Sequence, residues 1–316
     1  MIELIKILHP HPALLLIDNN EKHIVISDLH IGFEERFTKK GISIQSSTTN
    51  MQNVLRELII KEKPNDVIIL GDIKDSFVSV TKSERIEVPR FFREISKLSN
   101  IRVIPGNHDG NIKQLLPNNI TVEDVYGINI DKTTLLHGHT NINESFRKSN
   151  RIIIGHLHTI YNQQSSPVTG YQLWSILKAK KEYLFKEEDG MIEIITLPSF
   201  NKELTSSGFS IHRKKNICPI IRKTRSENHV TSEHFILWVS TELIYMLQKK
   251  HQHMLQSLHF HLVIYLIKMV LQQQFQNGEN LVTYQHQFKQ RWEAIILILF
   301  WLRKMLNKKD LTKRFY

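Results

Sequence analysis

The chain has 316 residues, a single cysteine and a formal net charge of +11. This length allows one large or two small domains, and the lone cysteine excludes both an intramolecular disulfide and a thiolate metal cluster. We expect a cytoplasmic protein with no membrane partner, because the N-terminus lacks a signal-peptide pattern and no apolar run is long enough to span a bilayer.

The positive charge is concentrated in the last third of the chain. Residues 1–200 carry 24 Lys and Arg against 24 Asp and Glu, whereas residues 201–316 carry 18 against 7. A basic segment beside a neutral one is typical of nucleic-acid binding, and a merely solvated tail gives the same composition.

The first 200 residues alternate between apolar runs typical of strands and segments with helical spacing. The spacing predicts helices over residues 48–63 and 83–98, a helical turn near 112–116 and a short helix over 141–150. The predicted strands are residues 23–27, 66–70, 101–104, 120–125, 133–136, 151–154, 170–177, 182–185 and 191–197. Strands that are first separated by helices and then follow closely predict an α/β fold of two packed sheets with helices outside.

Polar side chains follow five of these strands at their carboxyl ends, where α/β sheets place their ligands. One of the strands ends in Pro-Gly at 105–106 and opens into a tight loop that carries an amide, an imidazole and a carboxylate in succession. The five groups are Asp28 and His30; Asp72; Asn107, His108 and Asp109; His137 and His139; and His156 and His158.

Carboxylate, imidazole and amide groups without a thiolate suit divalent ions such as manganese, iron, zinc or nickel. The groups are too many for one ion, so we expect two divalent metal ions bridged by a carboxylate. Two ions about 3.5–4 Å apart can clamp a phosphate and convert a bridging water to hydroxide. An in-line attack also needs a proton donor for the leaving oxygen, and His108 followed by Asp109 suits that role.

The ordered motifs Asp-x-His, Gly-Asp, Gly-Asn-His-Asp, His and Gly-His-x-His resemble those of the calcineurin-like metallophosphoesterase superfamily. The resemblance covers about residues 1–200 and implies an αββα sandwich of two mixed β-sheets flanked by helices. Residues 27–35, Ser-Asp-Leu-His-Ile-Gly-Phe-Glu-Glu, are similar to the small, mainly archaeal SbcD-related phosphoesterases.

This resemblance implies a manganese-dependent phosphodiesterase that acts on nucleic acid or nucleotides through a metal-bound hydroxide. Three alternatives stay open on the same site: a phosphomonoesterase, a nucleotide pyrophosphatase, and a non-catalytic module that binds nucleic acid.

The resemblance also assigns a role to each group. Asp28, His30 and His158 would bind the first metal, Asp72 would bridge, and Asn107, His137 and His156 would hold the second. His108 would be the acid or the phosphate contact, oriented by Asp109. His139 lies outside the ligand set, and residues 73–75 are Ile-Lys-Asp where many members carry a histidine.

The composition of the sequence changes near residue 201, where glycine becomes scarce, glutamine becomes frequent and the β pattern stops. Helices are conceivable over residues 235–275, and residues 294–302 are apolar. We therefore predict a metallophosphoesterase domain over 1–200 and a basic, Gln- and His-rich, helix-prone tail over 201–316. The tail is read as a nucleic-acid-binding accessory domain, as a regulatory or oligomerisation segment, or as an out-of-frame translation after residue 199.

Overall fold

The computed structural model describes residues 4–38, 40–160, 172–207, 218–225 and 230–237. The chain divides into two compact units, Met1–Ile244 and Tyr245–Tyr316, and all described residues belong to the first. Within the described ranges, no helix combines the length and apolar character that crossing a membrane requires. Residues 238–275 and 294–302, where the tail was predicted to be helical or apolar, lie outside the described ranges.

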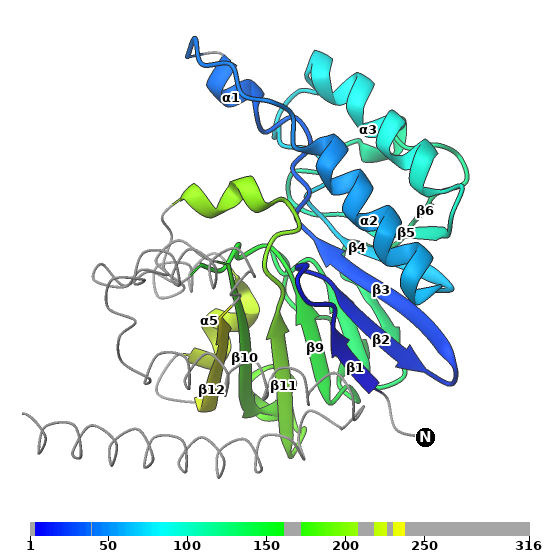
Figure 1. Cartoon of the computed structure of the whole chain (residues 1–316). Helices are drawn as coiled ribbons and strands as arrows, with labels where there is room; N and C mark the ends of the chain where they lie inside the picture. The colour runs from blue at the N-terminus through cyan, green and yellow to red at the C-terminus, as the bar shows by residue number, and fades with distance from the viewer. Residues whose placement is uncertain (1–3, 39, 161–171, 208–217, 226–229, 238–316) are drawn as a thin grey trace, which may run out of the picture. The chain divides into compact units, whose positions relative to one another are not determined.

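The first sheet contains six strands in the order β1-β2-β3-β4-β5-β6. The first three are joined antiparallel, and β3 to β6 run parallel. Two crossover helices, α2 (Thr48–Glu62) and α3 (Lys82–Ile95), cover one face of this sheet (Figure 1). The strands are β1 (Leu4–Ile7), β2 (Leu14–Asp18), β3 (Glu21–Ser27), β4 (Asp66–Leu70), β5 (Asn100–Ile104) and β6 (Thr121–Val122).

The second sheet has the order β12-β10-β11-β9-β8-β7, with β11, β9 and β8 parallel and the other pairs antiparallel. The buried side chains around the short helix α5 (Pro219–Arg225) share a core with this sheet. Because β12 pairs with β10, the sheet includes residues beyond 200. Its strands are β7 (Ile128–Ile130), β8 (Thr133–Leu136), β9 (Arg151–Ile154), β10 (Leu173–Lys180), β11 (Met191–Thr196) and β12 (Val230–Leu237).

Both faces of β3 and β4 are buried over residues 24–26 and 67–70, which explains the unbroken apolar sequence of these two stretches. Ile24 and Ile26 of β3 pack with the helix residues Leu55 and Phe92 in one core. The alternate residue Val25 is also fully buried and points to the opposite face, because successive strand side chains alternate. The predicted α/β fold of two mixed sheets flanked by helices is thereby confirmed.

Local signals account for the helix ends. Helix α3 begins with a capping box in which the Thr81 side chain accepts from the Glu84 amide and the Glu84 carboxylate accepts from the Thr81 amide. Helix α2 ends at the left-handed residue Lys63, directly before Pro64.

Some local predictions were wrong. The predicted strand 182–185 is instead a 3₁₀ turn, Lys181–Tyr183, followed by Leu184 and Phe185, which are buried against the second sheet. The short apolar run reflects burial, which does not distinguish a strand from a packed turn. Likewise, the predicted helix 141–150 contains only the 3₁₀ turn Glu144–Phe146. The strands β1, β2, β7 and β12 were not predicted, and residues 235–237 at the start of the conceivable helical segment 235–275 belong to β12.

Candidate metal centre

The backbone that carries the candidate ligands is strained. Asp28, His30, Asp72, His156 and His158 adopt φ angles of 57°, 43°, 51°, 66° and 40°, in the left-handed region that non-glycine residues rarely occupy. Each such residue costs about 1–3 kcal/mol, and such residues cluster at functional sites. The fold therefore holds these five side chains in place at an energetic cost.

Two glycines allow the ligand loops to approach each other closely. A Cβ atom on Gly106 would lie 2.2 Å from Asp72 Oδ1, and one on Gly155 would lie 2.8 Å from Asp28 Oδ2. Both distances are shorter than any tolerable contact, so only glycine fits beside the two carboxylates. The Gly of Gly-Asn-His-Asp and the Gly of Gly-His-x-His are thus steric requirements of the site.

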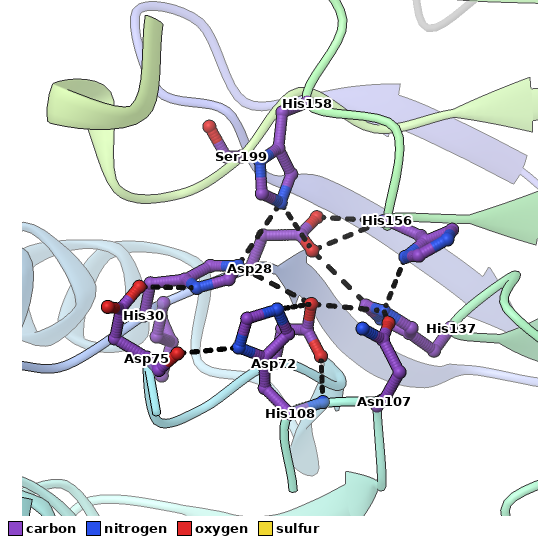
Figure 2. A network of polar contacts seen from close by, with 12 residues as sticks. Asp28, His30, Asp72, Asp75, Asn107, His108, His137, His156, His158 and Ser199 are labelled. Atoms are coloured by element: carbon purple, nitrogen blue, oxygen red, sulfur yellow. Dashed lines mark hydrogen bonds and ion pairs between the residues drawn. The ribbon is translucent and has the colours of Figure 1, made fainter. Parts of the chain in front are cut away.

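The first group of converging side chains comprises Asp28, His30, Asp72 and His158 (Figure 2). His158 Nε2 lies 3.1 Å from Asp28 Oδ1 and 3.2 Å from His30 Nε2. His30 Nε2 is in turn 3.4 Å from Asp72 Oδ2. All four candidate ligand atoms lie within 4.8 Å of one another.

The second group comprises Asp72, His137 and His156, again with ligand atoms within 4.8 Å of one another. His137 Nε2 lies 3.3 Å from Asp72 Oδ2 and 3.1 Å from His156 Nδ1. The amide oxygen of Asn107 is 3.1 Å from the same His137 nitrogen (Figure 2). Asp72 is common to both groups.

His30 and His137 each use Nδ1 for a hydrogen bond to the surrounding protein, so that Nε2 is the nitrogen that can bind a cation. His137 Nδ1 lies 2.7 Å from the Leu70 carbonyl oxygen, and His30 Nδ1 lies 3.1 Å from Asp75 Oδ1. Since each acceptor holds a proton on Nδ1, the Nε2 lone pair points into the cluster, as in metal-bound histidines. The oxygen and imidazole donors fit divalent ions of the first transition row.

The carboxylates and imidazoles perturb one another strongly. Burial would raise the pKa of Asp28, but the neighbouring His158 and His137 lower it to about 2. Burial would lower the pKa of His30, but the carboxylates of Asp72 and Asp75 raise it to about 9. Burial would likewise lower the pKa of His137, but Asp72 and Asp28 raise it to about 9. In the metal-free protein, this negative site therefore holds protons where a cation would bind.

His108 lies beside Asp72 and is oriented by a different group from the one predicted. His108 Nδ1 is 2.6 Å from the Asp75 carbonyl oxygen, and His108 Nε2 is 3.9 Å from Asp72 Oδ2. Burial lowers the pKa of this imidazole, and His30 lowers it further. The ring thus points Nε2 toward the cluster.

The prediction that Asp109 orients His108 was wrong. The Asp109 carboxylate accepts from the backbone N–H of Gly106 at 2.8 Å and of Ile73 at 2.9 Å. It therefore joins the loop after β5 to the loop after β4. Sequence adjacency did not reveal this, because neighbouring side chains on a tight loop can point in different directions.

Asp75 and Arg36 are two residues of the site that the motifs did not reveal. The Asp75 carboxylate accepts from His30 and also from Arg36 Nε at 2.5 Å and Arg36 Nη2 at 2.6 Å. The sequence offered one signal for Asp75, which is a second acidic residue three positions after Asp72, in the segment 73–75 that lacks the histidine of many family members.

His139 lies next to the cluster, outside both groups of converging ligands. Its ring centroid is 5.2 Å from that of His137, and its buried Nδ1 has no hydrogen-bond partner among the described residues. Burial and the neighbouring His137 lower the pKa of His139 to about 4, so this imidazole is neutral at physiological pH.

Residues 22–195, more than half of the chain, match the profile of the calcineurin-like phosphoesterases, so the chain belongs to this family. With its intact His/Asp site, the protein is a metal-dependent phosphoesterase. No curated protein matches the sequence.

Three of the solved structures that are similar to this chain illustrate the fold, all at low sequence identity. A nuclease from Pseudomonas putida has a TM-score of 0.42 at 16% identity, with 63% of this chain and 91% of the nuclease covered. The phosphoesterase Yfce from E. coli has a TM-score of 0.30 at 14% identity, with 56% and 79% covered. An archaeal phosphodiesterase has a TM-score of 0.24 at 20% identity, with 54% and 97% covered.

Proposed function

We propose that the protein is a dinuclear-metal phosphodiesterase that acts on nucleic acid or nucleotides, with manganese as the working metal. The observation that carries the proposal is the position of Asp72. Its Oδ2 atom lies 3.4 Å from His30 Nε2 and 3.3 Å from His137 Nε2, so one carboxylate serves two ligand groups. A shared carboxylate is the arrangement that a pair of bridged ions requires.

In this proposal, Asp72 bridges the two ions. The ions, when bound, would clamp the phosphate and activate a water for in-line attack. The first ion would be held by Asp28, His30 and His158, and the second by Asn107, His137 and His156.

His108 acts on the side of the departing oxygen. Its Nδ1 is fixed by the Asp75 carbonyl, so Nε2 is the nitrogen that faces a bound phosphoester. The proton donor is the imidazolium form of His108, which carries a proton on Nε2 as well as on Nδ1 and which the charge of Asp72 favours. As the P–O bond to the leaving group breaks, the Nε2 proton passes to the departing oxygen and leaves a neutral imidazole that is protonated on Nδ1. The same N–H also holds the phosphate in place before the reaction.

The preference for a diester rests on the sequence of residues 27–35, which is similar to that of the SbcD-related phosphoesterases. Asp28 and His30 of that segment lie in the first ligand group. We extend the proposal on this basis to nucleic acid or nucleotide substrates.

The test uses the purified full chain with manganese and two chromogenic substrates, bis(p-nitrophenyl) phosphate and p-nitrophenyl phosphate. We expect faster turnover of the diester and its loss in Asp72→Asn. The exposed Asp131→Asn is the control and should keep the wild-type rate. Faster monoester turnover would favour the phosphomonoesterase, and no turnover with any divalent metal would refute the proposal.

The division of roles is tested by metal content. Asn107→Ala should lose affinity for one of two bound ions, because it removes one amide oxygen from the second group. Isothermal titration with manganese measures both affinities, and equal weakening of the two ions would contradict the assignment.

A further inference from the structure

An exposed aromatic side chain stands beside the proposed proton donor. Phe77 lies on the loop between β4 and α3 and is 60% exposed. Single exposed apolar residues are common on protein surfaces and need no explanation by themselves. Phe77 differs because its ring packs on His108, with centroids 4.0 Å apart and an angle of 52° between the ring planes.

The loop that carries Phe77 is firmly anchored on its N-terminal side. The Ser76 backbone N–H and hydroxyl both donate to the buried Glu84 carboxylate, at 2.7 and 2.5 Å. The Lys74 ammonium donates to the Ser76 carbonyl, and the Asp75 carbonyl holds His108. Phe77 therefore follows two residues whose backbone is tied to the site, and its ring is pre-positioned.

The Phe77 ring lies on the side of the site where the leaving group of a substrate would extend in the proposed function. His108 Nε2 lies 3.9 Å from the bridging Asp72, and in the proposed function it meets the departing oxygen. The group esterified to that oxygen must then extend past His108, on the side where Phe77 lies. An exposed aromatic ring at this place would bind a flat aromatic group of the substrate by stacking. A nucleobase is such a group, because every base has a face that can stack on an aromatic side chain.

We infer that Phe77 forms a stacking subsite for a nucleobase of the substrate. This inference rests on the proposed function and specifies its substrate class: a nucleoside phosphoester with an unpaired base, because a base in a duplex is already stacked. The ring determines specificity through binding and takes no part in proton transfer.

The direct test is equilibrium binding, which does not depend on turnover. The full chain loaded with manganese is titrated calorimetrically with thymidine 5′-monophosphate and with 2-deoxyribose 5-phosphate, which carries a hydroxyl group in place of the base. Thymidine 5′-monophosphate should bind about tenfold more tightly, and Phe77→Ala should remove that difference. Phe77→Trp should restore it, because tryptophan keeps an aromatic face.

A matched control is Ile60→Ala, which removes another exposed apolar side chain, 56% exposed, near the C-terminal end of α2. This end lies next to the start of β4, at the opposite edge of the sheet, so the base preference should be unchanged. Equal affinity of the wild-type protein for the two ligands would overturn the inference. So would an equal loss of both affinities in Phe77→Ala, because Phe77 would then only support His108.

The binding result separates this inference from the proposed catalysis. A base preference that depends on Phe77, without diester turnover, would support the subsite and refute the phosphodiesterase. Normal diester turnover with no base preference would refute the subsite alone.

Discussion

Replacement of Asp75 by asparagine isolates the contribution of one charge to metal binding. The Asp75 carboxylate is buried, accepts from His30 Nδ1, and is clamped by two bonds from Arg36. Burial would raise its pKa, but hydrogen bonds from His30 and Arg36 lower it, so the group is ionised at neutral pH. Asparagine preserves the shape and one acceptor oxygen and removes the charge.

The expected magnitude follows from those contacts. A hydrogen bond to a charged group contributes about 1.5–3 kcal/mol, against about 0.5–1.5 kcal/mol for a neutral one. The His30 contact should therefore weaken by about 1–1.5 kcal/mol, and a less polarised imidazole is a poorer ligand. Loss of such partners typically reduces metal affinity 10- to 100-fold. The His108 contact uses the Asp75 backbone carbonyl, which the substitution retains.

The assay is diester hydrolysis as a function of manganese concentration. For Asp75→Asn, the concentration for half-maximal activity should rise 10- to 100-fold, and kcat at saturating manganese should stay within about threefold of wild type. Thermal unfolding of the metal-free proteins serves as the control for folding. A large fall in saturated kcat with unchanged metal dependence would refute this reasoning, because Asp75 would then act mainly through His108.

Three further predictions follow from the site. His108→Ala should retain both metals by elemental analysis and lose turnover, most of all for diesters with poor leaving groups, as a leaving-group series would show. Because the pKa values of His30 and His137 are about 9 in the metal-free protein, a cation must displace protons below that pH. Manganese affinity should therefore rise as pH increases from about 6.5 to 9, and calorimetry in two buffers should detect proton release; a pH-independent affinity would contradict this. Gly106→Ala should abolish metal binding, since its Cβ would lie 2.2 Å from Asp72 Oδ1, whereas Gly110→Ala, with no atom within 4 Å, should leave metal affinity unchanged.

Strand and helix predictions succeeded where one physical signal dominated. Runs of apolar and β-branched residues marked β3, β4, β8 and β9 because both faces of these strands are covered. The run that marked β5 is interrupted by Arg102, which is partly buried and bonds to Asp66 and Glu123. The strand predictions failed where apolar residues are buried without pairing to a neighbouring strand. Leu184 and Phe185 are buried and apolar like strand residues, yet they follow a 3₁₀ turn. Nothing local distinguishes the two cases, because the choice depends on what packs against the side chains.

The composition of the candidate site was also readable from the sequence. Polar residues at the carboxyl ends of successive buried strands must meet at one edge of an α/β fold. This topological rule predicts that Asp28, Asp72, His137 and His156 meet, and the structure places them in two groups that share Asp72. Their assignment to individual metal ions stays a prediction, and so does the domain boundary at residue 200.

The sequence by itself determined the chemical nature of the site, because residue types and their order at strand ends are properties of the chain. The tertiary structure decided which groups support it. The Asp75 carbonyl rather than Asp109 holds His108, Arg36 of the short helix α1 (Glu35–Thr38) binds the Asp75 carboxylate that contacts His30, and Phe77 packs on the proposed proton donor. Such contacts depend on the direction of each side chain within a tight loop, which the packing of neighbouring loops fixes and sequence spacing does not.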